Sequence, residues 1–179
     1  RFFVLLLHPF PEHDHMGLLA LANAPAYSLG PLIHNSVAVE ALEAQGVRVA
    51  QTVSDIPAGA RAIIRSHGVS REVLNALEAR AETIDATCPL VTKVHVEAKK
   101  FAQQGYTIVM VGHRGHEEVE GTMGEAPDSI VLVETIEDVE NLEVPDPDRV
   151  AHISQTTLSV DETLATVDQL KGRFPGLQA

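Results

Sequence analysis

Residues 106–118 read Tyr-Thr-Ile-Val-Met-Val-Gly-His-Arg-Gly-His-Glu-Glu, and this stretch sets the pattern for the rest of the chain. Its first half, 106–111, is apolar and rich in β-branched residues, which is typical of a buried strand. Its second half begins at Gly112 and carries two histidines and two glutamates. In parallel α/β sheets, ligands bind beyond the carboxyl ends of such strands. The stretch therefore predicts both a fold class and a place for chemistry.

Short apolar strands and amphipathic helices alternate along the whole chain. The pattern predicts strands at 2–7, 47–53, 62–64, 130–133 and 150–154, and helices at 36–45, 70–80, 89–104, 135–142 and 159–174. Gly46 and Gly105 end two of these helices, and Pro89 suits the first position of another. This alternation predicts an α/β fold made of repeated small domains, each with a parallel sheet flanked by helices. We expect two such domains, at 1–88 and 89–179.

Composition and charge exclude several classes of function. The 179 residues include 13 Lys and Arg against 25 Asp and Glu, which gives a net charge of −12. A chain this acidic is a poor candidate for binding nucleic acid or anionic membranes. No apolar run reaches the roughly 20 residues of a membrane span. Cys88 is the only cysteine, so no disulfide can form within the chain, and we expect a cytoplasmic protein.

Polar residues capable of chemistry follow successive strands at the same predicted edge. His67 follows the strand at 62–64, and Cys88 follows the apolar residues around Ile84. His113, His116 and Glu118 follow the strand at 106–111, and 155–157 (Gln-Thr-Thr) follows the strand at 150–154. Because carboxyl ends of parallel strands meet at one edge, this recurrence predicts a functional site.

Each of these residues also has an ordinary interpretation, which the pattern leaves open. His67 can be a loop histidine, Cys88 a small buried side chain, and the Thr156 hydroxyl a helix cap. Cys88 precedes Pro89 at a predicted helix N-terminus, a position that favours the thiolate needed for attack or metal ligation. His34 with Asn35 is either an anion-binding helix start or a plain capping turn.

The segment 8–15, His-Pro-Phe-Pro-Glu-His-Asp-His, fits no strand or helix period. Its prolines oppose regular structure, which favours a loop or a sequence foreign to the rest of the chain. His13 and His15, on either side of Asp14, also allow a metal-binding interpretation.

Five motifs, in order, resemble one family, the 4-hydroxy-3-methylbut-2-enyl diphosphate reductases of the methylerythritol phosphate route to isoprenoids. The resemblance covers about 27–174 and is specific because the motifs are long and ordered. The motifs are Leu29-Gly30-Pro31-Leu32-Ile33-His34-Asn35, Arg65-Ser66-His67-Gly68-Val69, the run 85–95 around Cys88, the run 112–124 from Gly112 to Gly124, and the run 154–160 from Ser154.

The resemblance implies an iron–sulfur oxidoreductase with three similar α/β domains, of which this chain carries the first two. It implies a [4Fe–4S] cluster held by three cysteines, with Cys88 as the middle ligand. The resemblance then implies that His34, His67 and His116 bind the diphosphate. It implies that Glu118 is the acid that protonates the departing hydroxyl, and that Thr156 is the neighbour of Glu118 on the substrate side. The implied reaction is reductive dehydroxylation to isopentenyl and dimethylallyl diphosphate, with electrons from a donor such as a ferredoxin or flavodoxin.

Two departures from the family matter for activity. The family's first cysteine lies in a Gly-Phe-Cys-x-Gly-Val motif, whereas residues 1–26 are atypical and contain no cysteine. The third cysteine belongs to the third domain, which is absent, so we expect an incomplete chain with one of the three thiolates. Two other functions stay open: a non-redox module that binds a diphosphate through its histidines, and a hydrolase that uses Cys88 or a histidine.

Overall fold

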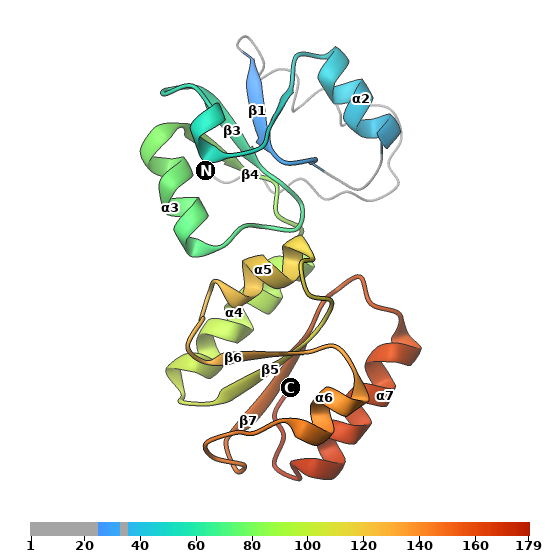
Figure 1. Ribbon diagram of the computed structural model, residues 1–179. Coiled ribbons are helices and arrows are strands. Elements are labelled where there is room, and N and C mark those ends of the chain that lie inside the picture. The colour runs from blue at the N-terminus through green and yellow to red at the C-terminus, as the bar shows by residue number, and fades with distance from the viewer. Residues whose placement is uncertain (1–24, 33–35) are drawn as a thin grey trace. The chain divides into compact units, whose positions relative to one another are not determined.

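The computed structural model describes residues 25–32 and 36–179. The predicted strand at 2–7, the segment 8–15 and His34 lie outside the described residues. The chain divides into two compact units, Arg1–Pro89 and Leu90–Ala179 (Figure 1). Each unit has its own sheet and its own core, and each is described below by itself.

The first unit contains a four-stranded parallel sheet in the order β2-β1-β3-β4. Helices α2 and α3 and a short 3-10 turn, η1, connect its strands (Figure 1). The strands are β1 (Ala26–Leu29), β2 (Arg48–Ala50), β3 (Arg61–Ile64) and β4 (Glu82–Asp85); the other elements are α2 (Ser36–Ala44), η1 (Val53–Asp55) and α3 (Arg71–Arg80).

Strand β3 is the centre of this first unit because both of its faces are buried. Ala62 and Ile64 point to one face, where they pack with Leu77 of α3. Ile63 points to the opposite face, where it packs with Ala26. This alternation follows from the two-residue period of a strand, and the turn at 65–68 follows at the carboxyl end of β3.

The second unit contains a three-stranded parallel sheet in the order β6-β5-β7. Four helices connect and cover its strands (Figure 1). The strands are β5 (Thr107–Val111), β6 (Ile130–Val133) and β7 (Val150–Ser154); the helices are α4 (Pro89–Gln103), α5 (Glu117–Met123), α6 (Ile136–Asn141) and α7 (Val160–Arg173).

Strand β5 divides the core of the second unit into two layers. Ile108 and Met110 face α4 and α5, where they pack with Phe101 and Val119. The alternate residues, including Val109, pack against α6 and α7 on the other face. Because β5 is covered on both sides, its uninterrupted apolar sequence is explained by burial on both faces.

The structure confirms the predicted α/β class, parallel sheets flanked by helices, and it corrects several boundaries. The predicted strand at 47–53 is too long, since β2 ends at Ala50. The Thr52 N–H and hydroxyl both donate to Asp55 Oδ2, at 2.8 and 2.9 Å, and this local bonding turns the chain into η1. The sequence pattern also failed to predict β1 and α5. No helix in the described part of the chain is long and apolar enough to cross a membrane.

Candidate functional site

In the second unit, the loop between β5 and α5 begins with a glycine that its surroundings require. A Cβ on Gly112 would lie 2.7 Å from Val119 Cγ2 and 3.2 Å from Gln155 Oε1. The Gly112 N–H donates to the Val133 carbonyl oxygen at 3.1 Å, which joins the loop to β6. The lack of a side chain therefore allows α5 and the residue after β7 to approach the end of β5.

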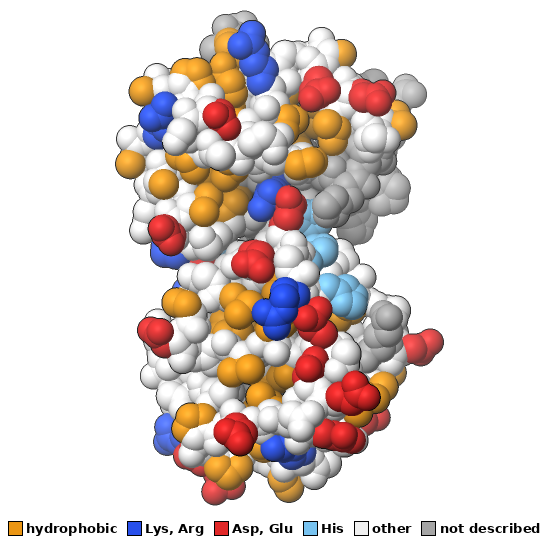
Figure 2. All heavy atoms as spheres, in the orientation of Figure 1, with side chains coloured by type: hydrophobic (Ala, Val, Ile, Leu, Met, Phe, Trp, Pro, Cys, Tyr) orange, Lys and Arg blue, Asp and Glu red, His pale blue; other side chains and the backbone are white. Residues whose placement is uncertain are grey.

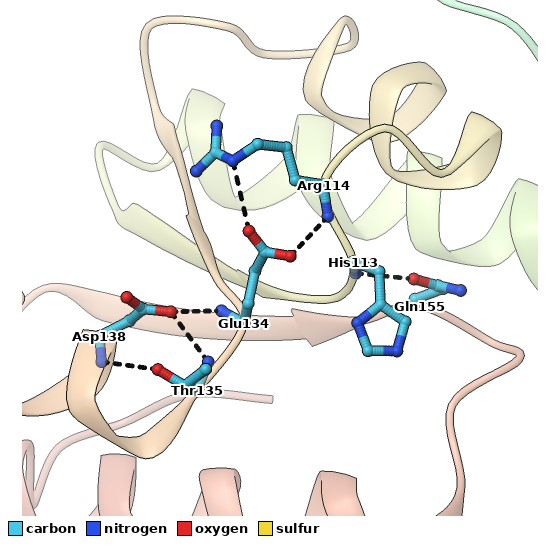
Figure 3. A network of polar contacts seen from close by, with 6 residues as sticks. All are labelled: His113, Arg114, Glu134, Thr135, Asp138 and Gln155. Atoms are coloured by element: carbon cyan, nitrogen blue, oxygen red, sulfur yellow. Dashed lines mark hydrogen bonds and ion pairs between the residues drawn. The ribbon is translucent and has the colours of Figure 1, made fainter.

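Two side chains then fix the loop from both sides (Figure 3). Gln155, which is 4% exposed, accepts a hydrogen bond from the His113 N–H at 3.0 Å. Glu134 accepts from the Arg114 N–H at 2.9 Å and from its Nε–H at 3.3 Å. Gln155 follows β7 and Glu134 follows β6, so both neighbours of β5 position the same loop.

Glu134 is in turn supported by the start of α6 (Figure 3). The N–H groups of Glu134 and Thr135 both donate to Asp138 Oδ2 at 2.9 Å, and the Thr135 hydroxyl accepts from the Asp138 N–H at 3.2 Å. Hydrogen bonds hold the pKa of the Asp138 carboxyl below its ordinary value. The largest effect comes from the Glu134 N–H, and the next largest come from Thr135. This capping arrangement fixes the backbone from which Glu134 projects.

Glu118, in the first turn of α5, is a completely buried carboxyl group. The Thr156 N–H donates to its Oε1 at 2.7 Å, and the Thr156 hydroxyl donates to its Oε2 at 2.9 Å. These distances are in the range of strong hydrogen bonds to a carboxylate. Thr156 is itself exposed, so the buried carboxyl is linked to the molecular surface through one hydroxyl group.

His116 precedes α5 and caps it. Its Nδ1 accepts a hydrogen bond from the Glu118 N–H at 3.2 Å. An accepting Nδ1 carries a lone pair, so in the neutral ring the hydrogen-bond network assigns the proton to Nε2. Gly115, with φ of 79°, makes the turn that brings His116 to this position.

In the first unit, two predicted residues follow the neighbouring strands β3 and β4. His67 is 8% exposed and lies in a turn closed by a hydrogen bond from the Gly68 N–H to the Arg65 carbonyl oxygen. The Cys88 N–H donates to the Ser66 carbonyl oxygen at 2.9 Å, which ties the end of β4 to that turn. Cys88 is half-buried and directly precedes α4.

The structure thus brings the predicted residues together in two groups. Glu118, Thr156 and His116 form one group at the carboxyl edge of the β5–β7 sheet. His67 and Cys88 lie on adjacent segments in the first unit, and His34 lies outside the described residues. Sequence reasoning placed Gln155 among the polar residues that follow strands but gave it no role, and it missed Glu134, which follows β6 and which the same rule would have found.

The second unit is more acidic than the first. The second unit has 7 Lys and Arg against 16 Asp and Glu, a net charge of −9, whereas the first unit has 6 against 9, a net charge of −3. Figure 2 shows many of these acidic side chains over the second unit. Among the described residues, no group of three or more His, Cys, Asp and Glu side chains is placed to hold a metal ion.

Comparison with known protein families identifies the family to which the chain belongs. The model of the family described as LytB protein matches residues 17–179. The chain belongs to this family. A 4-hydroxy-3-methylbut-2-enyl diphosphate reductase of Ralstonia nicotianae is 51% identical over 155 residues, and one of Acidothermus cellulolyticus is 51% identical over 160 residues. These matches cover 86% and 89% of this chain but 48% and 47% of the relatives, so the chain spans about half of their length.

Solved structures agree with this assignment. The E-1-hydroxy-2-methyl-but-2-enyl-4-diphosphate reductase of Plasmodium falciparum superposes with a TM-score of 0.86 at 34% identity, over 91% of this chain and 52% of that one. A second structure, described as (E)-4-hydroxy-3-methyl-but-2-enyl diphosphate reductase, the terminal enzyme of the non-mevalonate pathway, gives a TM-score of 0.78 at 33% identity, over 90% and 58% of the two chains. The resemblance inferred from the five motifs is therefore confirmed at the level of the family.

Proposed function

We propose that this LytB-family chain carries part of the substrate site of a reductase that acts on 4-hydroxy-3-methylbut-2-enyl diphosphate. Relatives with about 50% identity bear that name. The observation that carries the proposal is the pairing of Glu118 with Thr156. A completely buried carboxyl is costly to keep unless it is hydrogen-bonded and used, and here both of its oxygens accept hydrogen bonds from one exposed residue.

In this proposal, the Glu118 carboxyl supplies the proton that the leaving hydroxyl group takes up. Removing a hydroxyl group as water with two electrons consumes two protons in total, and at least one must reach the leaving oxygen. A carboxyl group fixed by two donors can give up and regain a proton without changing its position. The Thr156 hydroxyl both accepts and donates, so it can relay that proton between Glu118 and a ligand at the surface.

The histidines are proposed to hold the diphosphate. Neutral imidazole offers one N–H donor and adds no permanent charge, and the hydrogen bond to His116 Nδ1 leaves that proton on Nε2. His67, whose turn in the first unit is fixed by backbone hydrogen bonds, has a diphosphate-binding role that stays a prediction. His34 has the same predicted role, which stays a prediction because it lies outside the described residues.

The donor set of this chain does not fit a complete iron–sulfur cluster. The resemblance implies a [4Fe–4S] centre with three thiolates, but the sequence contains one cysteine, Cys88, and the described residues contain no metal-binding group of three or more side chains. We therefore propose for Cys88 the position of a single cluster ligand and assign no reaction step to a cluster. The ferredoxin or flavodoxin electron donor and the cytoplasmic location also stay predictions.

A second candidate function is binding of a diphosphate without redox chemistry, which needs only hydrogen-bond donors such as the Nε2–H of neutral His116. Two measurements separate the two proposals. The first is turnover of 4-hydroxy-3-methylbut-2-enyl diphosphate by the gene product that carries this sequence, purified without oxygen and supplied with a reductant, with iron content and cluster absorbance recorded in parallel. The second is calorimetric titration of the iron-free 179-residue chain with pyrophosphate.

Reductive turnover that disappears in Cys88→Ser would support the reductase. Pyrophosphate binding that weakens in His116→Ala, in a protein without iron or turnover, would support the binding module instead. A protein that shows neither activity would refute both proposals. A suitable control variant is His152→Gln, because His152 lies on β7 outside both groups of site residues.

A further inference from the structure

One peptide group in the loop after β5 is held at both of its polar atoms. The peptide that joins His113 to Arg114 donates through the Arg114 N–H to Glu134 Oε2 at 2.9 Å. Its other polar atom, the His113 carbonyl oxygen, accepts from the His116 N–H at 3.1 Å. Because a peptide group is planar, its N–H and its carbonyl turn together. The contact with Glu134 therefore fixes the direction of the carbonyl that holds His116.

His116 itself is held by hydrogen bonds from two directions. Its Nδ1 accepts from the Glu118 N–H at 3.2 Å, and its carbonyl oxygen accepts from the Glu120 N–H at 3.0 Å. Both of these partners belong to α5, so they orient His116 with respect to that helix. The bond from the His116 N–H to the His113 carbonyl comes from the loop, and it orients the residue with respect to the end of β5.

Glu134 also has an ordinary interpretation, as one half of an exposed ion pair. Its carboxyl lies 3.3 Å from Arg114 Nε, and the Arg114 side chain is 74% exposed, so this ion pair contributes little to stability. The contact with the Arg114 backbone N–H is shorter and is made by a group that cannot leave without moving the loop (Figure 3). The Glu134 N–H is in turn bound by Asp138, which fixes the backbone that carries the carboxyl.

We infer that Glu134 is a positioning residue for His116, and that it acts through the His113–Arg114 peptide to set the direction in which His116 presents its Nε2–H to a diphosphate. The inference rests on the proposed function, which makes His116 a diphosphate binder. Glu134 touches no ligand in this role. Its negative charge, in the more acidic of the two units, repels an anion, so its contribution to diphosphate binding must come from geometry.

The first test follows the His116 N–H without any ligand, by NMR-detected amide hydrogen exchange of the 179-residue chain. Glu134→Ala should reduce the protection of this N–H by about tenfold, which corresponds to one lost hydrogen bond. Arg114→Ala removes the ion pair but keeps the backbone N–H, so protection should stay within about twofold of the wild type. Amides of β7 report whether the unit as a whole stays folded. Unchanged protection in Glu134→Ala, or an equal loss in Arg114→Ala, would overturn the inference.

The second test measures pyrophosphate affinity by calorimetric titration of the same chain. Glu134→Ala should weaken binding by about three- to tenfold, the effect of one misdirected hydrogen bond, although the variant loses a negative charge. Glu137→Ala is the matched control, because it loses the same charge from an exposed side chain of α6, and it should bind pyrophosphate as tightly as the wild type or more tightly. Glu134→Gln keeps an oxygen that can accept from the Arg114 N–H, so it should recover most of the affinity.

The two tests distinguish failure of the inference from failure of the proposed function. If the wild-type chain binds pyrophosphate and the two alanine variants bind it equally well, the diphosphate site stands and the role of Glu134 is refuted. If the wild-type chain binds no pyrophosphate, the diphosphate role of His116 fails, and amide exchange alone decides whether Glu134 positions His116. Weaker binding in Glu134→Ala than in Glu137→Ala, together with the loss of His116 protection, would support the inference.

Discussion

The two units position their functional residues in different ways. In the first unit, backbone hydrogen bonds do this: Cys88 N–H to Ser66 O, and Gly68 N–H to Arg65 O. In the second unit, side chains do it, with Thr156 on Glu118 and Gln155 and Glu134 on the loop after β5. A backbone hydrogen bond survives most substitutions, whereas a side-chain hydrogen bond is lost with one residue. Single substitutions should therefore disturb the site of the second unit more than that of the first.

The largest effect on stability is expected from substitutions in the two cores, because each should destabilise only its own unit. Leu77 of α3 and Leu170 of α7 are both completely buried, each in the core of its own unit. Leu77→Ala and Leu170→Ala should each lower the unfolding free energy of their own unit by about 2–5 kcal/mol, measured by urea denaturation with probes in each unit. Leu164→Ala is the control, since Leu164 is 52% exposed on α7. Equal destabilisation of both units by either variant would contradict two independent cores.

A smaller effect is expected at the end of β5. Gly112→Ala places a methyl group against Val119 and Gln155, so it should destabilise the second unit by about 1–3 kcal/mol through overpacking. It should also weaken the hydrogen bond from His113 to Gln155. Gly172→Ala is the matched control, because Gly172 lies in α7 with no atom within 4 Å of its added Cβ; there alanine should stabilise the helix by about 1 kcal/mol. Thermal unfolding of both variants measures the contrast.

The smallest effect is expected from pH, and it should fall on the second unit. Burial lowers the pKa of both His95 and His152 below the ordinary value of 6.5. Between that value and the lower pKa values of the folded state, the unfolded chain binds more protons, so the unfolding free energy should fall as the pH is lowered through 6.5. Urea denaturation at several pH values should show this slope in the second unit. The slope should decrease in His95→Gln and in His152→Gln, and an unchanged slope in both would refute the assignment.

The elements that could be predicted from the sequence are those whose burial on both faces requires an apolar run of residues. β3 and β5 are buried on both faces, and both were evident as apolar runs. β1 was not, because its four residues include Ser28, a polar side chain that the structure buries by a hydrogen bond to the Gly30 carbonyl oxygen. α5 was not, because its seven residues contain Gly121 and three glutamates and show little helical period.

The sequence named candidate residues for the site but not the contacts between them. Polar residues after strands identified His67, Cys88, His116, Glu118 and Thr156 as candidates. The hydrogen bonds between Glu118 and Thr156 join residues 38 positions apart, and no local pattern encodes such a pairing. The same holds for His95 and Glu125, which are 30 positions apart. Long-range partners of this kind depend on how helices pack against the sheet, which sequence periodicity does not specify.

The Glu118 carboxyl, held by Thr156, is proposed to supply a proton to the leaving oxygen. The most direct test is the kcat of Glu118→Gln in the anaerobic turnover assay, with circular dichroism to confirm the fold. Glutamine keeps the size of the side chain and can still accept from the Thr156 N–H, but it cannot supply a proton. We expect kcat to fall by about 10²–10⁴-fold with little change in KM. Turnover of the variant at the wild-type rate would show that Glu118 does not supply the proton.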